Sequence, residues 1–410
     1  MTRSSSEAQF CVYLHDRLVG RLHRRENLTR FAFEESYGRD PRRAVLGLRF
    51  EENPHAWHRS NLRLPPWFSN LLPEGRLREW IAAARGVSAA REMELLAQVG
   101  HDLPGAVRVL AADETVPVEI PEAGALGAGR AMPETALWRF SLAGVALKFS
   151  MLARGDRLTV PALGEGGDWI VKLPDTVCPD LPWNEWAMMS LARAVGIDVP
   201  EIRLVHRDQV ESLPERAWAG GSGYAYAVKR FDRGSKRELI HIEDFAQVRG
   251  FYPEAKYSGS FETIGALVYR GHDVEALREF ARRLAFNILI GNGDAHLKNW
   301  SLIYRNPRVP TLAPAYDLVA TFVYRPATEG PEQMALSLDR SKRFESAHVS
   351  SFARLDAKLG AGAGLGDVAR ELVGKLCGEL PQISALLAGH PDLARRIEAH
   401  IKARASQLVR

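Results

Sequence analysis

Residues 291–299 read Gly-Asn-Gly-Asp-Ala-His-Leu-Lys-Asn, and this stretch decides how the rest of the chain is interpreted. Six of its nine residues are Gly, Asn, Asp or His, and mostly apolar segments flank it at 286–290 and 300–304. A polar loop held between two buried segments often carries function, because a rigid scaffold positions its reactive groups. The alternative is an ordinary polar turn, so the surrounding sequence has to decide between the two.

Two residues of this loop, Asp294 and Asn299, stand at the spacing Asp-x-x-x-x-Asn. Kinase catalytic loops use this spacing to place a carboxylate on the acceptor hydroxyl and an amide oxygen on magnesium. The spacing alone is weak, since about one chance match is expected in a chain of this length. A further carboxylate, Asp317, follows a predicted hairpin and has the oxygen chemistry that Mg²⁺ prefers. The alternative for Asp317 is to cap a short helix that begins at Leu318.

A lysine stands inside an apolar strand pattern, since residues 169–174 read Trp-Ile-Val-Lys-Leu-Pro. An unpaired charge on a buried strand is costly, so Lys172 needs a partner. Glu185 is available at the start of the helix predicted over 184–195. Kinases use such a strand lysine and helix glutamate to aim an ammonium group at ATP phosphates. The alternative is an edge-strand lysine that points to solvent.

Two further segments have the composition that nucleotide binding needs. Residues 141–148 form a loop of small side chains around Gly144, where backbone N–H groups can approach phosphate. The strand predicted over 224–230 continues to Asp232, so its backbone can bind adenine and Asp232 can accept from ribose hydroxyls. Arg230 and Asp232 can equally form an exposed ion pair of negligible value.

The composition is that of an ordinary globular protein. The 410 residues are 46% hydrophobic and 25% charged, which allows a sizeable core and two or three domains. The net charge of +4 neither demands nor excludes a nucleic-acid partner. Three widely spaced cysteines favour a reduced setting. Without a signal-peptide pattern or a run of ~20 apolar residues, we expect a cytoplasmic protein with no membrane contact.

The order of predicted elements divides the chain into units. The first elements are a hairpin over 9–22, helices over 76–85 and 89–98, and a strand over 105–110. Residues 111–135 are rich in Ala, Gly, Pro and Glu, as linkers are. Strand patterns prevail up to about residue 232 and helical patterns after it. The clearest helix is 274–290, where apolar residues recur every three or four positions and form one face.

In this order, the segments resemble the HipA family, the toxin kinases of bacterial type II toxin–antitoxin systems. The resemblance runs from about residue 10 to residue 400. Its markers are Asn-Leu-Leu-Pro-Glu-Gly at 70–75, Ser-Leu-Ala-Gly at 141–144, Ile-Val-Lys-Leu-Pro at 170–174, Asn-Glu at 184–185, Val-Lys-Arg-Phe-Asp-Arg at 228–233, Glu-Asp-Phe-Ala-Gln at 243–247, the loop at 289–299 and Leu-Ala-Pro-Ala-Tyr-Asp at 312–317.

The resemblance implies an α+β, two-lobed protein-kinase-like fold with an extra small N-terminal α+β subdomain and a mostly helical C-terminal lobe. The expected boundaries are 1–110 for the N-terminal subdomain, 111–135 for the linker, 136–232 for the kinase N-lobe with its ATP-phosphate loop, and 233–410 for the helical C-lobe with its catalytic and metal-binding loops. The resemblance also implies ATP and Mg²⁺ as cofactors.

The resemblance assigns catalytic roles to residues of the loop 291–299. Asp294 would be the catalytic aspartate, and Asn299 and Asp317 the magnesium ligands. His296 and Lys298 would be positive donors that stabilise charge on the transferred group.

ATP binding and self-modification are assigned in the same way. The implied ATP-binding residues are Lys172, Glu185, Gly144, Lys229, Phe231, Asp232 and His296, with the backbone of Lys229 and Phe231 on adenine. Ser141 matches the serine that such kinases autophosphorylate, and the added negative charge would pull its loop away from ATP phosphates. The chain departs from the family pattern at Ala146, where Gln is usual, which affects the expected contacts between loop and phosphate.

The implied function is an ATP-dependent serine/threonine protein kinase that acts as a toxin on a translation-related protein, such as an aminoacyl-tRNA synthetase. The implied partners are that substrate and a small HipB-like DNA-binding antitoxin, with DNA contacted only through the antitoxin. Two alternatives stay open. One is a weakly catalytic co-repressor that binds the antitoxin, because the first 110 residues carry no catalytic motif. The other is a small-molecule phosphotransferase, which shares the Asp-x-x-x-x-Asn spacing.

Overall fold

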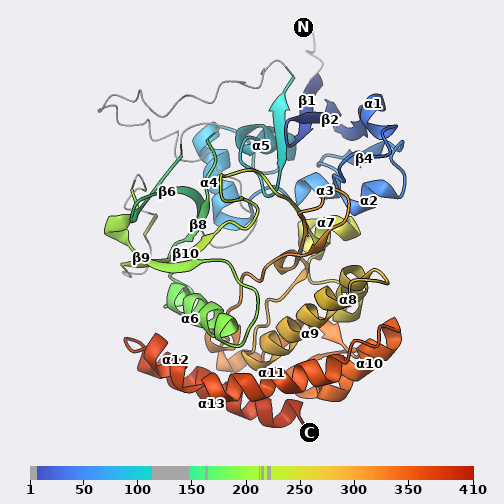
Figure 1. The fold of residues 1–410 in the computed structure, drawn as a ribbon. Helices are drawn as coiled ribbons and strands as arrows, with labels where there is room; N and C mark the ends of the chain where they lie inside the picture. The colour runs from blue at the N-terminus through green and yellow to red at the C-terminus, as the bar shows by residue number, and fades with distance from the viewer. Residues whose placement is uncertain (1–6, 113–146, 162–164, 212, 214–216, 219–222) are drawn as a thin grey trace.

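Three units make up the molecule in Figure 1: an N-terminal α+β unit, a strand-rich small lobe and a helical lobe. The computed structural model describes residues 7–112, 147–161, 165–211, 213, 217–218 and 223–410. The arrangement confirms the predicted two-lobed, kinase-like α+β fold with an extra N-terminal unit. Most of the predicted linker and the loop that contains Ser141 and Gly144 lie outside the described residues.

The N-terminal unit is built on a five-stranded antiparallel sheet in the order β4-β3-β2-β1-β5. Its strands are β1 (Glu7–Leu14), β2 (Arg17–Arg25), β3 (Leu28–Phe33), β4 (His58–Asn61) and β5 (Val107–Ala111). Its helices are α1 (Glu35–Gly38), α2 (Leu48–Glu51), α3 (Pro66–Ser69), α4 (Gly75–Arg85) and α5 (Glu92–Val99). The predicted hairpin and both predicted helices are present, and the second helix begins three residues later than expected.

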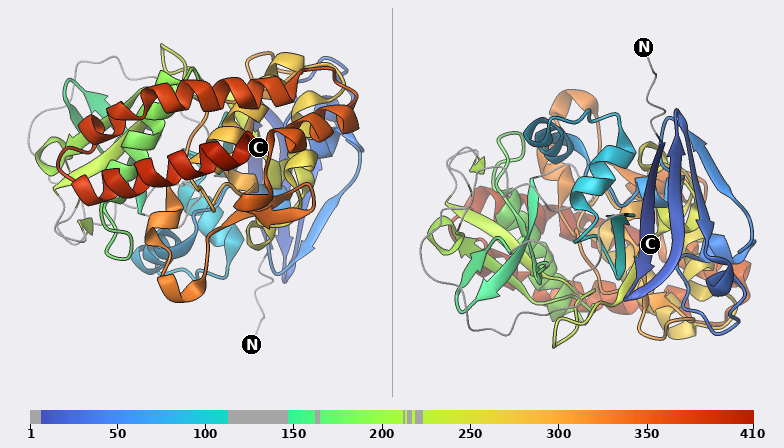
Figure 2. Two further views of the ribbon diagram at one scale, coloured as in Figure 1. Left: turned by 90° about the horizontal axis from the view of Figure 1, so that it is seen from below. Right: turned by 90° about the horizontal axis from the view of Figure 1, so that it is seen from above.

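The small lobe contains a second five-stranded sheet, in the order β7-β6-β8-β10-β9, with one long helix beside it. Its elements are β6 (Lys148–Arg154), β7 (Arg157–Thr159), β8 (Trp169–Lys172), α6 (Leu181–Ala194), β9 (Ile202–His206) and β10 (Tyr224–Lys229). Figure 2 shows this lobe beside the N-terminal sheet when the molecule is seen from above. Because β8 lies between β6 and β10, its side chains are held at the centre of the sheet.

The helical lobe follows β10 and carries the C-terminal helices along its base (Figures 1 and 2). Its helices are α7 (Phe245–Arg249), α8 (Phe261–Tyr269), α9 (Val274–Leu289), α10 (Val349–Leu359), α11 (Leu365–Glu379), α12 (Pro381–Leu386) and α13 (Pro391–Leu408). Its strands are β11 (His241–Asp244), β12 (Ser301–Tyr304), β13 (Thr311–Leu312), β14 (Gln333–Leu338) and β15 (Ser341–Arg343). Among the described residues, none of the helices combines the length and apolar character that crossing a bilayer requires.

Helix α9 matches the strongest helical pattern in the sequence. The Asp273 side chain accepts a hydrogen bond of 3.0 Å from the Ala276 N–H and so caps the helix N-terminus. The apolar face, which includes Phe280 and Leu284, is buried in the lobe. The helix ends at Leu289, and the loop 291–299 begins directly after it. A rigid, buried helix therefore fixes the point at which the polar loop starts.

Two apolar cores hold the three units together. Phe31 and Phe68 of the N-terminal unit belong to the same buried cluster as Phe149 and Trp169 of the small lobe. Helix α6 belongs to the other cluster, in which it joins the small lobe to the helical lobe. Burial of apolar surface stabilises such contacts by about 25 cal/mol per Å². The N-terminal unit is therefore packed against the small lobe and is not merely tethered to it.

Candidate active site

One cavity of about 690 Å³ lies where the three units meet. Its wall includes Glu74 from the N-terminal unit, Lys172 from β8 and Asp294 from the loop after α9. The predicted site residues that the structure describes all line it: Lys172, Glu185, Lys229, Phe231, Asp232, Asp294, His296, Lys298, Asn299 and Asp317. The fold thus gathers around one cavity predicted site residues that are up to 145 positions apart.

An ion-pair cluster stands at the centre of the cavity wall. The Lys172 ammonium group contacts both the Glu185 Oε1 atom on α6 and the Asp317 Oδ1 atom. The predicted pairing of Lys172 with Glu185 is therefore confirmed, and the alternative of a solvent-facing edge lysine is wrong. Burial alone would lower the pKa of Lys172, but the two carboxylates outweigh it and raise that pKa above its usual range.

The two carboxyl groups of this cluster respond in opposite directions. Burial raises the pKa of Glu185 to about 7, against the opposing effect of Lys172. Burial also raises the pKa of Asp317, but Lys172 and Lys148 outweigh it and hold that pKa below its usual range. A cavity that shifts the pKa values of two neighbouring carboxyl groups in opposite directions has the electrostatics expected of a functional site.

A second lysine, Lys148, belongs to the same cluster and was missed in the sequence. It stands directly opposite Lys172 in the pairing of β6 with β8, and it lines the cavity. Burial lowers its pKa, while Asp317 acts in the opposite direction. Lys148 is the last residue of the loop of small side chains, and only its register with Lys172 reveals its place. Lys148, Lys172, Glu185 and Asp317 are termed the cavity cluster below.

Asp317 has an unusual backbone that the loop around it holds in place. Its φ of +55° lies in the left-handed region, which non-glycine residues seldom adopt and which is frequent at functional sites. The Asn292 amide donates to the Asp317 carbonyl over 3.3 Å. Asn184 on α6 exchanges two hydrogen bonds with the backbone of Ala320, of 3.1 and 3.0 Å. No helix begins at Leu318, so the alternative role of Asp317 as a helix cap is wrong.

The loop 291–299 exposes the Asp294 side chain to solvent, and hydrogen bonds from neighbouring residues hold it in place. The Asp294 side chain is 52% exposed, and its Oδ1 atom accepts a hydrogen bond of 2.6 Å from the Tyr257 hydroxyl. The Asn299 amide donates to the Asp294 carbonyl over 2.7 Å. The Asp294 N–H donates to the Asn292 side chain over 3.0 Å. Tyr257 was not identified in the sequence, because its contact with Asp294 spans 37 residues.

His296 and Lys298 do not have the settings that the sequence suggested. Burial lowers the pKa of His296 to about 4, although Asp294 opposes the shift, so the ring is neutral at pH 7 and supplies no positive charge. The Lys298 ammonium group donates to the Asn70 carbonyl over 2.9 Å and to its side-chain oxygen over 3.1 Å. Its charge is therefore directed at the N-terminal unit. Both residues still line the cavity.

The strand end after β10 also differs from expectation. Asp232 accepts two hydrogen bonds from Arg230, of 3.0 and 2.8 Å, and one of 2.7 Å from the Gly105 N–H. Asp102 accepts from Arg230 over 2.7 Å and from Arg233 over 2.9 Å. Asp232 is thus committed to buried protein partners, so its assignment to ribose is corrected. The pair of Arg230 and Asp232 is buried, so the exposed-pair alternative is also wrong.

Asp102, Arg230, Asp232 and Arg233 are termed the hinge network below. Nearby, the Lys229 N–H donates to the Glu201 carbonyl over 2.8 Å, so it is not free to bind adenine. The Phe231 N–H has no hydrogen-bond acceptor among the described residues, and the Phe231 ring lies 5.6 Å from the Tyr316 ring, centroid to centroid. Of the two backbone positions predicted to bind adenine, Lys229 and Phe231, only Phe231 has a free N–H group among the described residues.

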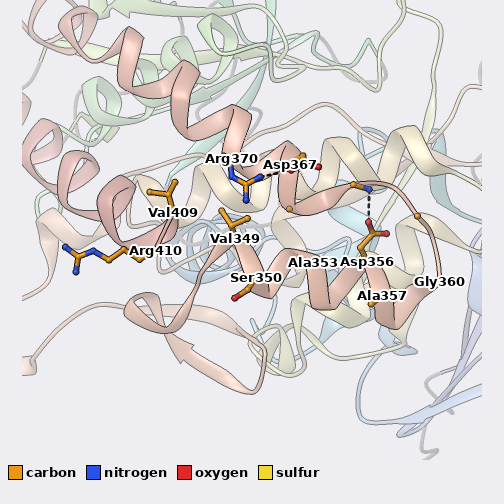
Figure 3. A pocket seen from close by; sticks show the side chains of 13 residues that line it. Val349, Ser350, Ala353, Asp356, Ala357, Gly360, Asp367, Arg370, Val409 and Arg410 are labelled. Carbon is orange, nitrogen blue, oxygen red and sulfur yellow. Dashed lines mark hydrogen bonds and ion pairs between the residues drawn. The ribbon is translucent and has the colours of Figure 1, made fainter.

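A second hollow, of about 770 Å³, lies on the helical lobe between α10, α11 and the last residues of the chain (Figure 3). Its carboxylates serve local structure. Asp356 accepts hydrogen bonds of 2.9 and 2.7 Å from the N–H groups of Ala363 and Gly364, and Asp367 pairs with Arg370 over 2.6 Å. Both carboxylates of the hollow in Figure 3 are thus occupied by partners in the same part of the helical lobe.

The donor set of the first cavity fits a magnesium–nucleotide complex. Asp317 offers a carboxylate and Asn299 an amide oxygen on the same wall. Mg²⁺ is commonly held by one or two such oxygens together with phosphates and water. The Lys148 and Lys172 side chains supply positive charge beside them. A cavity of this size also accommodates a nucleotide-sized ligand.

Comparison with known proteins identifies two family models along the chain. A HipA N-terminal domain model matches residues 10–110, and a HipA-like C-terminal domain model matches residues 140–383. The chain is 44% identical over 360 residues to a putative kinase, Y4dM, of Sinorhizobium fredii, with 84% of each chain covered. It is 31% identical over 343 residues to a second putative kinase, Y4mE, of that organism, covering 76% of this chain and 77% of the relative.

A more distant relative carries a more specific name. The chain is 28% identical over 308 residues to the serine/threonine-protein kinase toxin HipA of Shewanella oneidensis, covering 66% of this chain and 65% of the relative. A solved complex of HipA, HipB and operator DNA, a toxin–antitoxin system from the same organism, contains a chain with the same fold. The TM-score is 0.75 at 20% identity, and 97% of each chain is covered.

Proposed function

The chain belongs to the HipA family, and from that premise we propose that it is an ATP- and magnesium-dependent serine/threonine protein kinase. One observation supports the proposal most. Asp294, Asn299 and Asp317 line the same 690 Å³ cavity as the pair of Lys172 and Glu185. These are the parts that phosphoryl transfer by kinases requires: a base, metal ligands and a phosphate-binding lysine oriented by a glutamate.

In the proposed reaction the acceptor hydroxyl approaches Asp294, whose exposed carboxylate accepts its proton. The acceptor oxygen forms a bond to the γ-phosphorus, the bond from that phosphorus to the bridging oxygen breaks, and ADP leaves. The Lys172 ammonium group holds the phosphates in line, and Glu185 keeps that group in place. The exposure of Asp294 suits an acceptor carried on another protein.

Asn299 and Asp317 are the residues that would hold magnesium with the nucleotide. Bound Mg²⁺ supplies positive charge that offsets the charge of the phosphates during transfer. The bond from Asn292 holds the left-handed backbone of Asp317, and Lys172 contacts its carboxylate. Phe231 is the proposed hinge contact for adenine.

The biological role proposed for this kinase is that of a toxin in a type II toxin–antitoxin system of the cytoplasm. Its substrate would be a translation-related protein such as an aminoacyl-tRNA synthetase, and its partner a HipB-like antitoxin that contacts DNA. The names of the Shewanella relative and of the solved complex support this role. We also propose autophosphorylation of Ser141 as self-inactivation, and Lys298 as a residue that supports the catalytic loop.

Phosphate transfer from labelled ATP tests the proposal directly. The purified chain is incubated with Mg²⁺, labelled ATP and a cell extract, and an Asp294→Ala variant is the control. We expect label on a protein serine or threonine with the wild type and loss of that label with the variant. Equal labelling by both, or none by either, would contradict the proposal. Labelling of a small molecule alone would favour the phosphotransferase alternative. Absence of labelling, together with operator repression in a separate DNA-binding assay with the antitoxin, would favour the co-repressor.

A further inference from the structure

We infer that Asn70 and Glu74 of the N-terminal unit are positioning residues for the catalytic loop, and that they act through Lys298. The inference rests on the proposed kinase function. Asn70 and Glu74 belong to the segment between α3 and α4, more than 220 residues before the loop that they contact. They line the same cavity as Asp294 and Asn299. On this view the N-terminal unit is part of the catalytic machinery of its own chain.

Lys298 carries the contact from the side of the loop. Its ammonium group donates to the Asn70 carbonyl and side-chain oxygen, and it lies 3.1 Å from the Glu74 Oε1 atom. Its other charged neighbour is Asp244, at 3.7 Å. The Lys298 side chain is only 4% exposed. A buried ammonium group requires such partners, because an uncompensated buried charge costs several kcal/mol.

Glu74 also contacts Lys256, a residue that is hydrogen-bonded to the loop 291–299. Its Oε2 atom lies 3.0 Å from the Lys256 ammonium group. The Lys256 carbonyl in turn accepts a hydrogen bond of 3.0 Å from the N–H of Leu297, the residue before Lys298. Burial would raise the pKa of Glu74, but Lys298 and Lys256 outweigh it and lower that pKa to about 2. One carboxylate therefore holds the loop from two directions and stays ionised at neutral pH.

Asn70 completes the connection on the opposite side. Its amide group donates to the Phe251 carbonyl over 2.7 Å, just before Lys256 in the helical lobe. It also donates to the Pro66 carbonyl over 2.8 Å within the N-terminal unit. With both amide hydrogens occupied, the side-chain oxygen is oriented toward Lys298. Two hydrogen bonds that do not involve the loop therefore fix the orientation of the Asn70 side chain.

The position of Lys298 explains why this contact matters for chemistry. Lys298 directly precedes Asn299 and lies four residues after Asp294. Its carbonyl accepts a hydrogen bond of 3.0 Å from the hydroxyl of Tyr316, the neighbour of Asp317. The residue is therefore linked at one end to the N-terminal unit and at the other to both proposed metal ligands. A displacement of about 1 Å in such groups can slow catalysis by about 10²-fold.

The test replaces Glu74 by Gln in the full chain and measures two quantities. The first is amide hydrogen exchange of residues 291–299, which reports loop opening without any need for activity. The second is phosphate transfer to the acceptor found with the wild type, separated into kcat and the KM for ATP. We expect loop exchange to become at least about tenfold faster, kcat to fall about 10- to 100-fold, and the KM for ATP to change less than about twofold.

Three further variants keep the result interpretable. Glu254→Gln removes the ion pair between Arg63 and Glu254, at 2.9 Å, which also joins the N-terminal unit to the helical lobe but includes no residue of the loop 291–299. It should leave loop exchange and kcat within about twofold of the wild type. Glu74→Asp keeps the charge and should recover part of both effects. Asn70→Ala removes the side-chain acceptor of Lys298 together with the bonds that Asn70 donates to Phe251 and Pro66, but it keeps the Glu74 carboxylate, and it is the second variant if Glu74→Gln fails to fold.

Folded Glu74→Gln and Asn70→Ala variants with wild-type loop exchange and wild-type kcat would overturn the inference. An equal effect of Glu254→Gln would do the same, because the contact would then stabilise the junction in general. Should the wild type transfer no phosphate, the proposed function fails, while loop exchange still decides whether Asn70 and Glu74 hold the loop.

Discussion

The cavity cluster and the hinge network are two buried ionic assemblies of the same size that differ in what surrounds them. Each contains two basic and two acidic side chains, and each joins units that are distant in sequence. In the hinge network every nitrogen of the Arg230 guanidinium group donates to an acceptor, and these acceptors include the Ser150 hydroxyl and the Leu103 carbonyl. The network is closed, with its side chains at most 6% exposed.

The cavity cluster borders the cavity, and the pKa values of its two carboxyl groups are shifted in opposite directions. The pKa of Glu185 is raised to about 7 while that of Asp317 is lowered, and Asp317 has a left-handed backbone. In the hinge network, Arg230 and Arg233 outweigh burial and lower the pKa of Asp232 to about 2, as expected of a satisfied ion pair. Buried charge alone therefore does not identify a functional site. The opposed pKa shifts of Glu185 and Asp317 and the adjoining cavity are what distinguish the cavity cluster from the hinge network.

The largest effect is expected from the cavity cluster. Asp317→Asn should reduce phosphate transfer about 10³- to 10⁴-fold, because metal-assisted charge stabilisation contributes several kcal/mol to the transition state. The free energy of unfolding should fall by less than the about 3–5 kcal/mol expected when a fully buried pair is broken, because the Asp317 side chain is 27% exposed and Lys172 keeps its contact with Glu185. Parallel transfer assays and urea unfolding measure both quantities. Retained transfer, or a loss explained by unfolding, would remove the distinction between the two assemblies.

The hinge network should show the reverse pattern. Asp102→Asn leaves Arg230 and Arg233 with too little negative charge in a buried site, and this should lower the free energy of unfolding by about 3–5 kcal/mol. Urea denaturation measures the change. Glu211→Gln breaks the exposed pair with Arg157 and should leave the free energy of unfolding almost unchanged. A loss of similar size in both variants would mean that burial of the network adds no stability.

The same contrast explains what the sequence could and could not predict. The apolar repeat of α9 and the spacing of Asp294 and Asn299 are local patterns, and the structure contains the helix and brings both residues to the cavity. The pair of Lys172 and Glu185 spans only 13 residues and was predicted by simple reasoning about burial. Contacts within one or two elements leave a readable pattern, because the periodicity of the element fixes which side chains meet.

Longer contacts left no such pattern. Asp232 looked free for ribose because the Gly105 N–H that donates to it, and the Asp102 carboxylate that shares Arg230 with it, lie about 130 residues earlier. Lys148 was missed because only the register of β6 with β8 places it beside Lys172. The roles of Asn70 and Glu74 depend on how the N-terminal unit packs on the helical lobe. The domain boundaries stay a prediction.

An intermediate effect is expected from a histidine that is enclosed by protein on the hinge side of the molecule. His241 is buried, its Nε2 atom bonds to the Leu46 carbonyl over 2.8 Å, and burial lowers its pKa to about 4. As the pH falls, His241 therefore takes up a proton near pH 6.5 in the unfolded chain but only near pH 4 in the folded chain. The stabilisation is present above pH 6.5 and is lost as the pH falls toward 4, by about 3 kcal/mol in total.

Urea unfolding across pH 4 to 8 measures this loss as the difference between the wild type and His241→Gln. The difference is needed because burial raises the pKa of Glu243 to about 7, which changes stability with the opposite sign. The variant should show a flatter acid limb, and His55→Gln, at an exposed position, serves as the control. An unchanged acid limb in His241→Gln would show that this ring does not sense pH.

The smallest effect is expected from a variant that tests whether Lys148 and Lys172 of the cavity cluster have different roles. Lys148→Met should raise the KM for ATP about tenfold, since a charge-assisted hydrogen bond to phosphate contributes about 1.5–3 kcal/mol. The kcat should stay within about threefold, because Lys172 keeps its carboxylate partners. Lys229→Met alters another lysine of the same cavity, one that pairs with Glu201, and should change KM less than about twofold. A fall in kcat with unchanged KM would instead place Lys148 with Asp317 in the chemistry of transfer, and the cavity cluster would then act as one catalytic unit.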